Sequence, residues 1–317
     1  MKRSPRAKPS EAQRQKRFYD GKVDGYTPVY QDAQAFRLLM AQQAEGARRY
    51  GMFGCSLKAV RNRRELDRLD LKTGEKVLDA GCGGGLLLNQ LAARYGADGT
   101  GVDLAPLAVQ RAKACGDPKL RYRVAQLERL PFKDASFDAV VSFDVLEHVQ
   151  DKQAVLKELL RVLKPGGRFL FYAISRRDAL TWHWCLRAAS FGRLGQDNEA
   201  GHVHALFLDP RATRRSLAAL GATGLSLGYL HSFFGLAVDE AVFWAARQRS
   251  RGAAPAPAPG RGAGKRGPLT GAVVPRSKRW LYQALRALSP LVELLELPWK
   301  LLGLSNGFFI RGQKEMS

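Results

Sequence analysis

The chain has 317 residues, of which 45% are hydrophobic, and a formal net charge of +22 at pH 7. This length can bury a sizeable core, and the composition is that of an ordinary globular protein, which argues against a wholly disordered chain. Two stretches concentrate the basic residues: residues 1–17 hold seven Lys or Arg and one Glu, and residues 247–279 hold nine Lys or Arg and no acidic residue. Such stretches suit anionic membrane surfaces or nucleic acid, and a basic tail that only confers solubility is an equal alternative.

Four cysteines are scattered along the chain without a Cys-x-x-Cys pair: Cys55, Cys82, Cys115 and Cys185. This pattern predicts reduced thiols in a cytosolic setting and argues against a disulfide framework or a zinc site. The charged N-terminus lacks the apolar segment of a secretory signal. We therefore expect a cytoplasmic protein, with peripheral attachment to the inner membrane face left open by the basic stretches.

The first 70 residues predict an arm followed by a helical cap. Residues 1–17 are basic and polar, which predicts a disordered arm. Residues 18–70 predict the cap, with one helix over about 32–50 and another over 57–69.

Strand and helix patterns alternate after residue 70, which predicts the α/β class with a doubly wound, mostly parallel sheet covered by helices on both faces. We expect helices near 86–95, 105–115 and 151–163, and strands near 76–80, 99–103, 120–124, 138–143 and 168–174. The turn formers Pro165-Gly166-Gly167 are expected to end the last of these helices.

Residues 175–210 follow the fifth predicted strand and look loop-like and aromatic. We interpret them as a lid or substrate region in which Trp182 lines the substrate side, and a peripheral helix whose tryptophans fill the core is the alternative. His202 and His204 near its end are further substrate candidates. No acid or cysteine completes a ligand set beside them, so no metal is expected. Asp209 and Pro210 then predict the start of a helix that reaches residue 220.

The C-terminal part contains a low-complexity stretch and an apolar one. Residues 247–279 are rich in Pro, Ala and Gly, which predicts a flexible basic insert. Residues 280–304 are apolar, but charges interrupt them and Pro290 and Pro298 are expected to divide them into short amphipathic helices rather than a membrane span. These helices suit a membrane surface, and packing over a substrate pocket is the alternative.

One stretch combines a buried strand, a glycine turn and a helix, over residues 76–95. This geometry lets a ligand lie against bare backbone at a helix N-terminus. Asp79 ends the strand, and its negative charge favours a cationic ligand over a pyrophosphate. Asp103 ends the next strand, where a carboxylate can accept both hydroxyls of a ribose. Together the two acids predict a site for a nucleoside that carries positive charge.

Five motifs in order make the chain resemble the class I S-adenosylmethionine-dependent methyltransferases, and among them the enzymes of ubiquinone and menaquinone biosynthesis. The motifs are Asp79-x-Gly81-x-Gly83, Asp103, Leu130-Pro131-Phe132 with Ser136-Phe137-Asp138, Phe143 to Val149, and Leu163 to Gly167. The resemblance covers residues 70–175 well, and 200–231 and 305–314 more loosely. It implies a Rossmann-like sheet of seven strands in one domain (71–246 and 305–314), whose last two strands, 224–230 and 307–313, are antiparallel.

The resemblance implies S-adenosyl-L-methionine as the cofactor, with Asp79 near its ammonium group and Asp103 on its ribose hydroxyls. Gln126 stands where the family often has Asp or Asn. His148 is the candidate general base, and a role in tying its loop to the sheet is the alternative. The full set of implied cofactor residues is Asp79, Gly81, Cys82, Gly83, Asp103, Leu104, Gln126, Leu127 and Phe143.

We expect methyl transfer to oxygen or carbon of a small apolar acceptor that is aromatic, quinone-like or lipid-like. Methylation of RNA or protein is an alternative that the basic stretches suggest, although no Asn-Pro-Pro-Tyr motif for amino nitrogen follows the fourth strand. A membrane-associated scaffold that binds the cofactor without turnover is a second alternative. Besides the acceptor, the expected partner is an anionic membrane surface contacted through residues 247–304, and nucleic acid is less expected.

Overall fold

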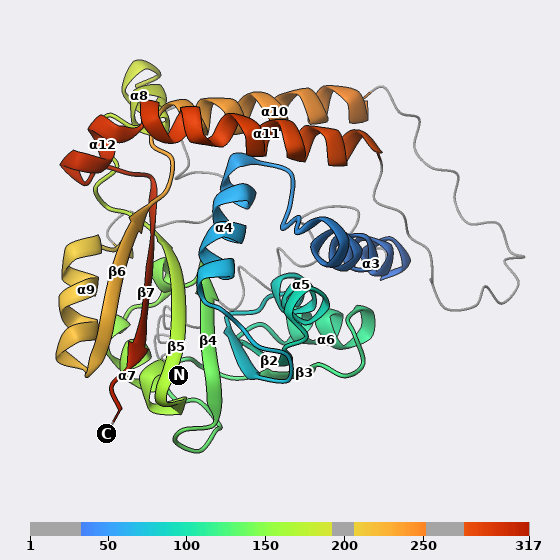
Figure 1. The fold of residues 1–317 in the computed structure, drawn as a ribbon, viewed down its shortest axis with the longest axis vertical. Helices are drawn as coiled ribbons and strands as arrows, with labels where there is room; N and C mark the ends of the chain where they lie inside the picture. Colours follow the sequence, from blue (N-terminus) through green and yellow to red (C-terminus); the bar gives the residue numbers. More distant parts are fainter. Residues whose placement is uncertain (1–32, 192–205, 252–275, 317) are drawn as a thin grey trace, which may run out of the picture.

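The computed structural model describes residues 33–191, 206–251 and 276–316 (Figure 1). Its seven strands form one sheet in the order β3-β2-β1-β4-β5-β7-β6. Strands β1 to β5 pair in parallel, whereas β7 is antiparallel to both β5 and β6. The strands are β1 (Lys76–Ala80), β2 (Asp98–Asp103), β3 (Arg121–Val124), β4 (Phe137–Phe143), β5 (Leu163–Ile174), β6 (Ala222–Tyr229) and β7 (Gly307–Lys314). The predicted fold class is confirmed, including the two antiparallel strands.

Helices cover both faces of the sheet because successive strand residues point to opposite sides. On one face, Leu78 and Val140 pack with apolar residues of α7 (Lys152–Val162) and α9 (Pro210–Ala219). On the other face, Val77 packs with residues of α3 (Ala33–Tyr50), α4 (Leu57–Arg68) and α5 (Leu86–Tyr95). The helix α6 (Pro106–Cys115) packs beside α5 through Val109 and Ala112.

Four local expectations were wrong. Residues 182–189 form the helix α8 (Trp182–Ala189) rather than a loop, and Thr181 caps it. Both ends of the expected flexible insert 247–279 are helical, because α10 (Phe234–Arg251) extends to Arg251 and α11 (Arg276–Leu295) begins at Arg276, and residues 252–275 lie outside the described part of the chain. Pro290 lies inside α11 instead of breaking it, and only Pro298 begins a new helix, α12 (Leu297–Leu302). The fifth strand begins at Leu163, which already pairs with Phe137, so the turn formers 165–167 lie within it beside a register shift.

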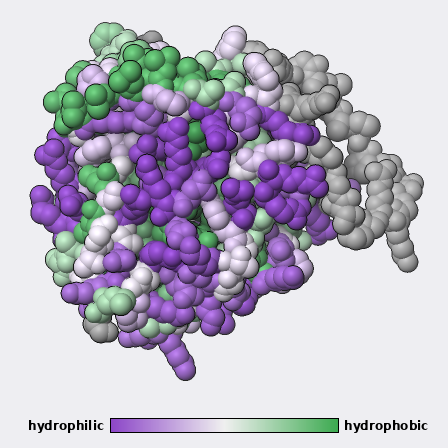
Figure 2. Space-filling view, viewed as in Figure 1, coloured by the Kyte–Doolittle hydropathy of each residue, from purple (hydrophilic) through white to green (hydrophobic). Residues whose placement is uncertain are grey.

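Helices α10, α11 and α12 form a cover over the edge where α4 meets the sheet (Figure 1). The inner face of α11 is buried against α4, where Tyr282, Leu285 and Val292 contact Leu57 and Val60. This burial offsets the hydrogen bond that Pro290 removes from the helix. The outer side remains apolar, as Figure 2 shows at the edge above α4 where α11 and α12 lie. No described helix is both long enough and apolar enough to span a membrane.

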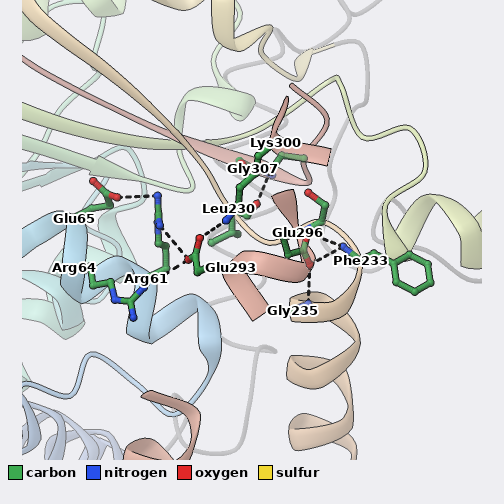
Figure 3. A network of polar contacts seen from close by, with 12 residues as sticks. Arg61, Arg64, Glu65, Leu230, Phe233, Gly235, Glu293, Glu296, Lys300 and Gly307 are labelled. Atoms are coloured by element: carbon green, nitrogen blue, oxygen red, sulfur yellow. Dashed lines mark hydrogen bonds and ion pairs between the residues drawn. The ribbon is translucent and has the colours of Figure 1, made fainter. Parts of the chain in front are cut away.

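A polar network fixes this cover to α4 and to the sheet (Figure 3). Arg61 of α4 contacts Glu293 of α11 at 3.0 Å and Glu65 at 3.1 Å, and Lys300 pairs with the same Glu293. The fully buried Glu296 accepts hydrogen bonds from the N–H groups of Ser232 at 2.7 Å and Phe233 at 3.0 Å, just before α10, and of Gly235 at 2.9 Å in its first turn. The N-terminus of α10 is therefore capped by a residue more than 60 positions away.

Replacing Glu296 by Ala should lower the free energy of unfolding by about 3 kcal/mol, because several buried N–H groups lose a charged acceptor. Urea unfolding followed by circular dichroism measures the change. The control is Glu240→Ala on the exposed side of α10, for which we expect a change within about 0.5 kcal/mol. A loss below about 1 kcal/mol for Glu296→Ala would contradict the capping role.

Candidate functional site

The turn between β1 and α5 is fixed by backbone hydrogen bonds to the neighbouring strand. The N–H groups of Gly81 and Cys82 both donate to the carbonyl oxygen of Val102, at 2.8 and 2.9 Å. Gly81, Gly83 and Gly85 have φ values of 84°, 50° and 82°, in the left-handed region that favours glycine. The predicted cofactor residues Gly81, Cys82 and Gly83 therefore form one tight turn at the carboxyl edge of the sheet.

The glycines of this turn differ in how much space surrounds them, and the space at one of them suits a bound ligand. A Cβ atom on Gly81 would lie 2.2 Å from Val145, and one on Gly84 would lie 2.9 Å from Phe36 of α3. A Cβ atom on Gly83 would meet no atom of the described residues within 4 Å. The turn is thus closed by Val145 and α3 but open above Gly83, so a ligand can approach the backbone there.

Asp79 supplies a buried negative group beside this opening. Its side chain is 2% exposed, and its Oδ2 atom has no hydrogen-bond partner among the described residues. Burial, together with the nearby carboxylate of Asp103, raises the pKa of Asp79 to about 7. A buried acceptor that lacks a donor is costly unless a ligand supplies one. A cationic group such as an ammonium fits this position, because it would both donate to Oδ2 and offset the charge.

Asp103 is held in a fixed orientation by the backbone. Its Oδ2 atom accepts a hydrogen bond from Gly83 N–H at 2.8 Å, and its Oδ1 atom accepts one from Ala105 N–H at 2.9 Å. Each carboxylate oxygen can accept a second hydrogen bond. The side chain is only partly buried, so paired hydroxyls of a ligand could use both oxygens. The structure thus brings the two predicted acids to the same turn.

The remaining predicted cofactor residues lie at the carboxyl ends of the neighbouring strands. Leu104 follows Asp103 and is half-buried, while Gln126 follows β3 and is exposed. Leu127 is buried in the core beneath them, so its side chain packs with the sheet. Phe143 ends β4, and its ring lies 6.1 and 6.2 Å from the rings of Tyr172 and Phe309.

The candidate base His148 lies in the 3-10 helix η1 (Leu146–His148) and is half-buried. The backbone N–H of His148 donates to the carbonyl oxygen of Val145 at 2.9 Å. This bond links His148 to Val145, the residue that covers Gly81. The neighbouring Glu147 is fully buried. Burial and the charge of Asp144 raise the pKa of the Glu147 carboxyl to about 8, so it is mostly protonated at pH 7.

Of the three substrate candidates, only Trp182 lies among the described residues. The ring of Trp182 packs edge-on against Phe233 at 5.3 Å, within the aromatic contacts between α8 and the start of α10. His202 and His204 lie outside the described residues. In the described part of the chain, no cluster of three or more His, Cys, Asp or Glu side chains could hold a metal ion.

Sequence reasoning missed an ion pair at this edge, between Lys58 of α4 and Asp144. Its atoms Nζ and Oδ1 are 2.9 Å apart. The position of Asp144 directly after the fourth strand was a signal for it. Nothing in the sequence distinguished Lys58 among the 51 basic residues.

Residues 78–171 match the family profile described as "Methyltransferase domain". The chain is 44% identical over 116 residues to a ubiquinone biosynthesis O-methyltransferase of Xanthomonas oryzae pv. oryzae (strain PXO99A), an alignment that covers 35% of this chain and 48% of that protein. It is 32% identical over 179 residues to the protein of the same name from Coxiella burnetii (strain Dugway 5J108-111), covering 55% of this chain and 76% of the relative. The chain thus spans about half the length of the first relative and about three quarters of the second.

Among solved structures, the fold is similar to that of phosphoethanolamine N-methyltransferase 2 from Haemonchus contortus in complex with S-adenosyl-L-methionine. The TM-score is 0.56 at 17% identity, and the match covers 98% of this chain and 61% of that one. At this identity the likeness concerns the fold. The motifs, the sheet order and the relatives agree, and the chain therefore belongs to the class I S-adenosylmethionine-dependent methyltransferases.

Proposed function

We propose that the protein binds S-adenosyl-L-methionine at the turn after β1 and transfers its methyl group to oxygen or carbon of a small apolar acceptor. The observation that carries this proposal is the buried carboxyl of Asp79, whose Oδ2 atom has no partner in the described part of the chain, next to the oriented carboxylate of Asp103. Asp79 would hold the ammonium group, and Asp103 would accept from the ribose hydroxyls. Gly81 and Gly83 would allow the backbone to approach.

When bound, the cofactor supplies a methyl group on a sulfonium, and the protein positions the methyl donor and the acceptor relative to each other. Methyl transfer is an in-line displacement, so holding donor and acceptor in line accounts for much of the rate. Leu104 and Gln126 would flank the adenine, and Phe143 would lie beneath the methionine part. His148 would accept a proton from an acceptor that needs deprotonation. Trp182 and the unplaced residues His202 and His204 are the proposed substrate side.

The acceptor class is supported by the relatives, which are named ubiquinone biosynthesis O-methyltransferases. An aromatic or quinone-like acceptor also suits the half-buried ring of Phe143 at the end of β4, which lies beside the buried rings of Tyr172 and Phe309. Methylation of RNA or protein remains the second candidate because of the basic stretches. A scaffold without turnover is the third.

Cofactor affinity should depend on pH through Asp79. Its pKa of about 7 lies above the ordinary value of 3.8, so below pH 7 the carboxyl is protonated and cannot pair with the ammonium. The dissociation constant of S-adenosylhomocysteine, measured by calorimetry, should therefore rise as pH falls from 7.5 to 5.5, by roughly tenfold per unit below the pKa. Asp79→Asn should bind more weakly at pH 7.5 and lose this pH dependence. An unchanged slope in the variant would contradict the role of Asp79.

Replacing Asp103 by Ala should weaken the same ligand by roughly 30-fold or more, because two charge-assisted hydrogen bonds to hydroxyls are lost. Asp98→Asn is the matched control, since Asp98 begins the strand that Asp103 ends and pairs with Arg121 at 2.6 Å. We expect the control to bind within twofold of the wild type. Equal losses in both variants would argue for a general effect on β2.

Transfer of labelled methyl groups separates the three candidate functions. We expect label in small phenols or catechols, increased when the acceptor carries an apolar tail, and none in RNA or protein. Label in RNA would support the second candidate. Binding of the cofactor without label in any acceptor would support the scaffold.

We further propose that the cover of α10, α11 and α12 contacts an anionic membrane surface. The outer sides of these helices expose large apolar side chains, which include Trp244, Trp280, Leu294, Leu301 and Leu302 (Figure 2). Six of the nine Lys or Arg of residues 247–279 lie at the facing ends of α10 and α11, so the same cover carries basic charge: Arg247, Arg249, Arg251, Arg276, Lys278 and Arg279. Apolar insertion combined with basic charge favours anionic lipid over a neutral membrane or a protein partner.

Flotation with vesicles tests this contact. The wild type should float with vesicles of phosphatidylglycerol but weakly with phosphatidylcholine, because each basic residue near an anionic surface contributes about 1 kcal/mol. The double variant Leu294→Glu with Leu301→Glu should float several-fold less. Leu38→Glu on the exposed side of α3 is the control and should float like the wild type. Equal flotation of all three proteins would contradict the proposal.

A further inference from the structure

The backbone of Lys58 at the start of α4 is held by the neighbouring Ser56 and by the distant Asp239 of α10. Ser56 caps the helix by accepting from Ala59 N–H at 3.0 Å. Asp239 of α10 accepts from the N–H groups of Leu57 at 2.6 Å and of Lys58 itself at 2.9 Å. The C-terminal cover thus fixes the backbone from which the Lys58 side chain extends.

The ammonium group of Lys58 lies at the carboxyl edge of the sheet, beside the turn that is open above Gly83. Its Nζ atom is 2.9 and 3.0 Å from the two carboxylate oxygens of Asp144 and 4.3 Å from the ring centre of Tyr172. Asp144 follows β4 directly, and the next residue, Val145, is the one that covers Gly81. Asp144 of the ion pair is therefore the direct neighbour of Val145, the residue that packs on the turn proposed to bind the cofactor.

The geometry of this pair is strained and open, which argues for a role beyond stability. Asp144 has a φ of 56°, in the left-handed region that non-glycine residues rarely adopt. The side chains of Lys58 and Asp144 are 35% and 47% exposed, so the pair is half-buried and can be reached from one side. Exposed ion pairs contribute little to stability. An oxygen of a bound molecule can reach the ammonium from this open side.

The ammonium of Lys58 has three N–H donors and directs two of them to Asp144, so a third is left for an oxygen of a bound molecule. Asp144 is matched by Lys58. The buried Glu147, with its pKa raised to about 8, is mostly neutral. Burial also raises the pKa of Tyr172, which stays neutral. Asp239 is engaged by two backbone N–H groups.

We propose that Lys58 binds the acceptor oxygen and stabilises it as an oxyanion, so that the acceptor is an acidic hydroxyl compound, a phenol or an enol, methylated on oxygen. This inference rests on the proposed function and narrows it from oxygen or carbon to oxygen. The hydroxyl proton passes to His148, the base of the proposed function, and from there to water. An electron pair of the oxygen then forms the bond to the methyl carbon as the bond from methyl to sulfur breaks, and that bonding pair stays on sulfur, which becomes a neutral thioether. Lys58 stays protonated throughout, and Asp144 is a positioning residue that orients it.

A chromophoric phenol tests this inference without turnover. The compound 4-nitrocatechol changes its visible absorption on ionisation, and an ammonium within about 4 Å should lower its bound pKa by about 1 to 2 units. The titration is made with protein saturated with S-adenosylhomocysteine. We expect the shift in the wild type, its loss in Lys58→Met, and partial retention in Lys58→Arg.

The matched control is Lys164→Met, which removes another lysine–aspartate pair, that of Lys164 at the start of β5 with Asp138 at the start of β4, at 2.6 Å. It should keep the full shift. A shift that survives in Lys58→Met, or that is absent from the wild type, overturns the inference. Failure of the wild type to bind S-adenosylhomocysteine would instead contradict the proposed function, so the two failures are distinguishable.

Turnover gives a second measurement that a merely structural role would not change. In the wild type, the acid limb of the kcat profile should follow the lowered pKa of the bound hydroxyl, because kcat reports ionisations in the enzyme–substrate complex. In Lys58→Met this limb should move upward by about 1 to 2 pH units. An unchanged limb with a uniformly lower rate would indicate loss of structure and would overturn the inference.

Discussion

The site depends on a carboxyl group that the fold buries without a full set of partners. Asp79 is fixed at the end of β1, where the parallel pairing that builds the sheet also places Asp103 nearby. The raised pKa means that the folded protein holds this proton more tightly than the unfolded chain. Stability from this group is therefore greatest at low pH and falls as pH rises from about 4 to about 7. Burial also raises the pKa values of Glu147 and Asp239, so these two carboxyl groups change stability with pH in the same direction. The ligand-free protein is thus less stable in the pH range where its carboxylates can bind a cation.

The turn with its two acids and the residues that surround it come from different parts of the chain. The region that matches the methyltransferase profile supplies the turn and both acids. The flanking segments supply what surrounds them: Phe36 of α3 packs against Gly84, and Lys58 of α4 meets Asp144. Helices α10 and α11 in turn hold α4 through Asp239 and Glu293. The matched region thus holds the proposed cofactor residues, and we propose that the flanking segments contribute to acceptor choice.

Local sequence signals predicted the elements that form by local rules. The strands from β1 to β4, the cap at Asp209 and the turn at Gly81 to Gly85 all follow from apolar runs and turn residues, and the structure has them. The missed features depend on distant partners. The helix α10 has its N-terminus capped by Glu296, so no cap stands before it in sequence. Pro290 is tolerated because α11 buries its inner face on α4. The pairing of Lys58 with Asp144 joins residues 86 positions apart, which no spacing rule could reveal.

The central claim is that Asp79 receives its missing partner from the cofactor. Carbon-13 NMR of the carboxyl groups, with Asp79 assigned by comparison with Asp79→Asn, measures its pKa directly. The account predicts a pKa near 7 in the free protein and a fall of at least about 1 unit when S-adenosylhomocysteine saturates the site, because a nearby cation favours the ionised form. An ordinary pKa in the free protein, or a pKa that the ligand leaves unchanged, would contradict it.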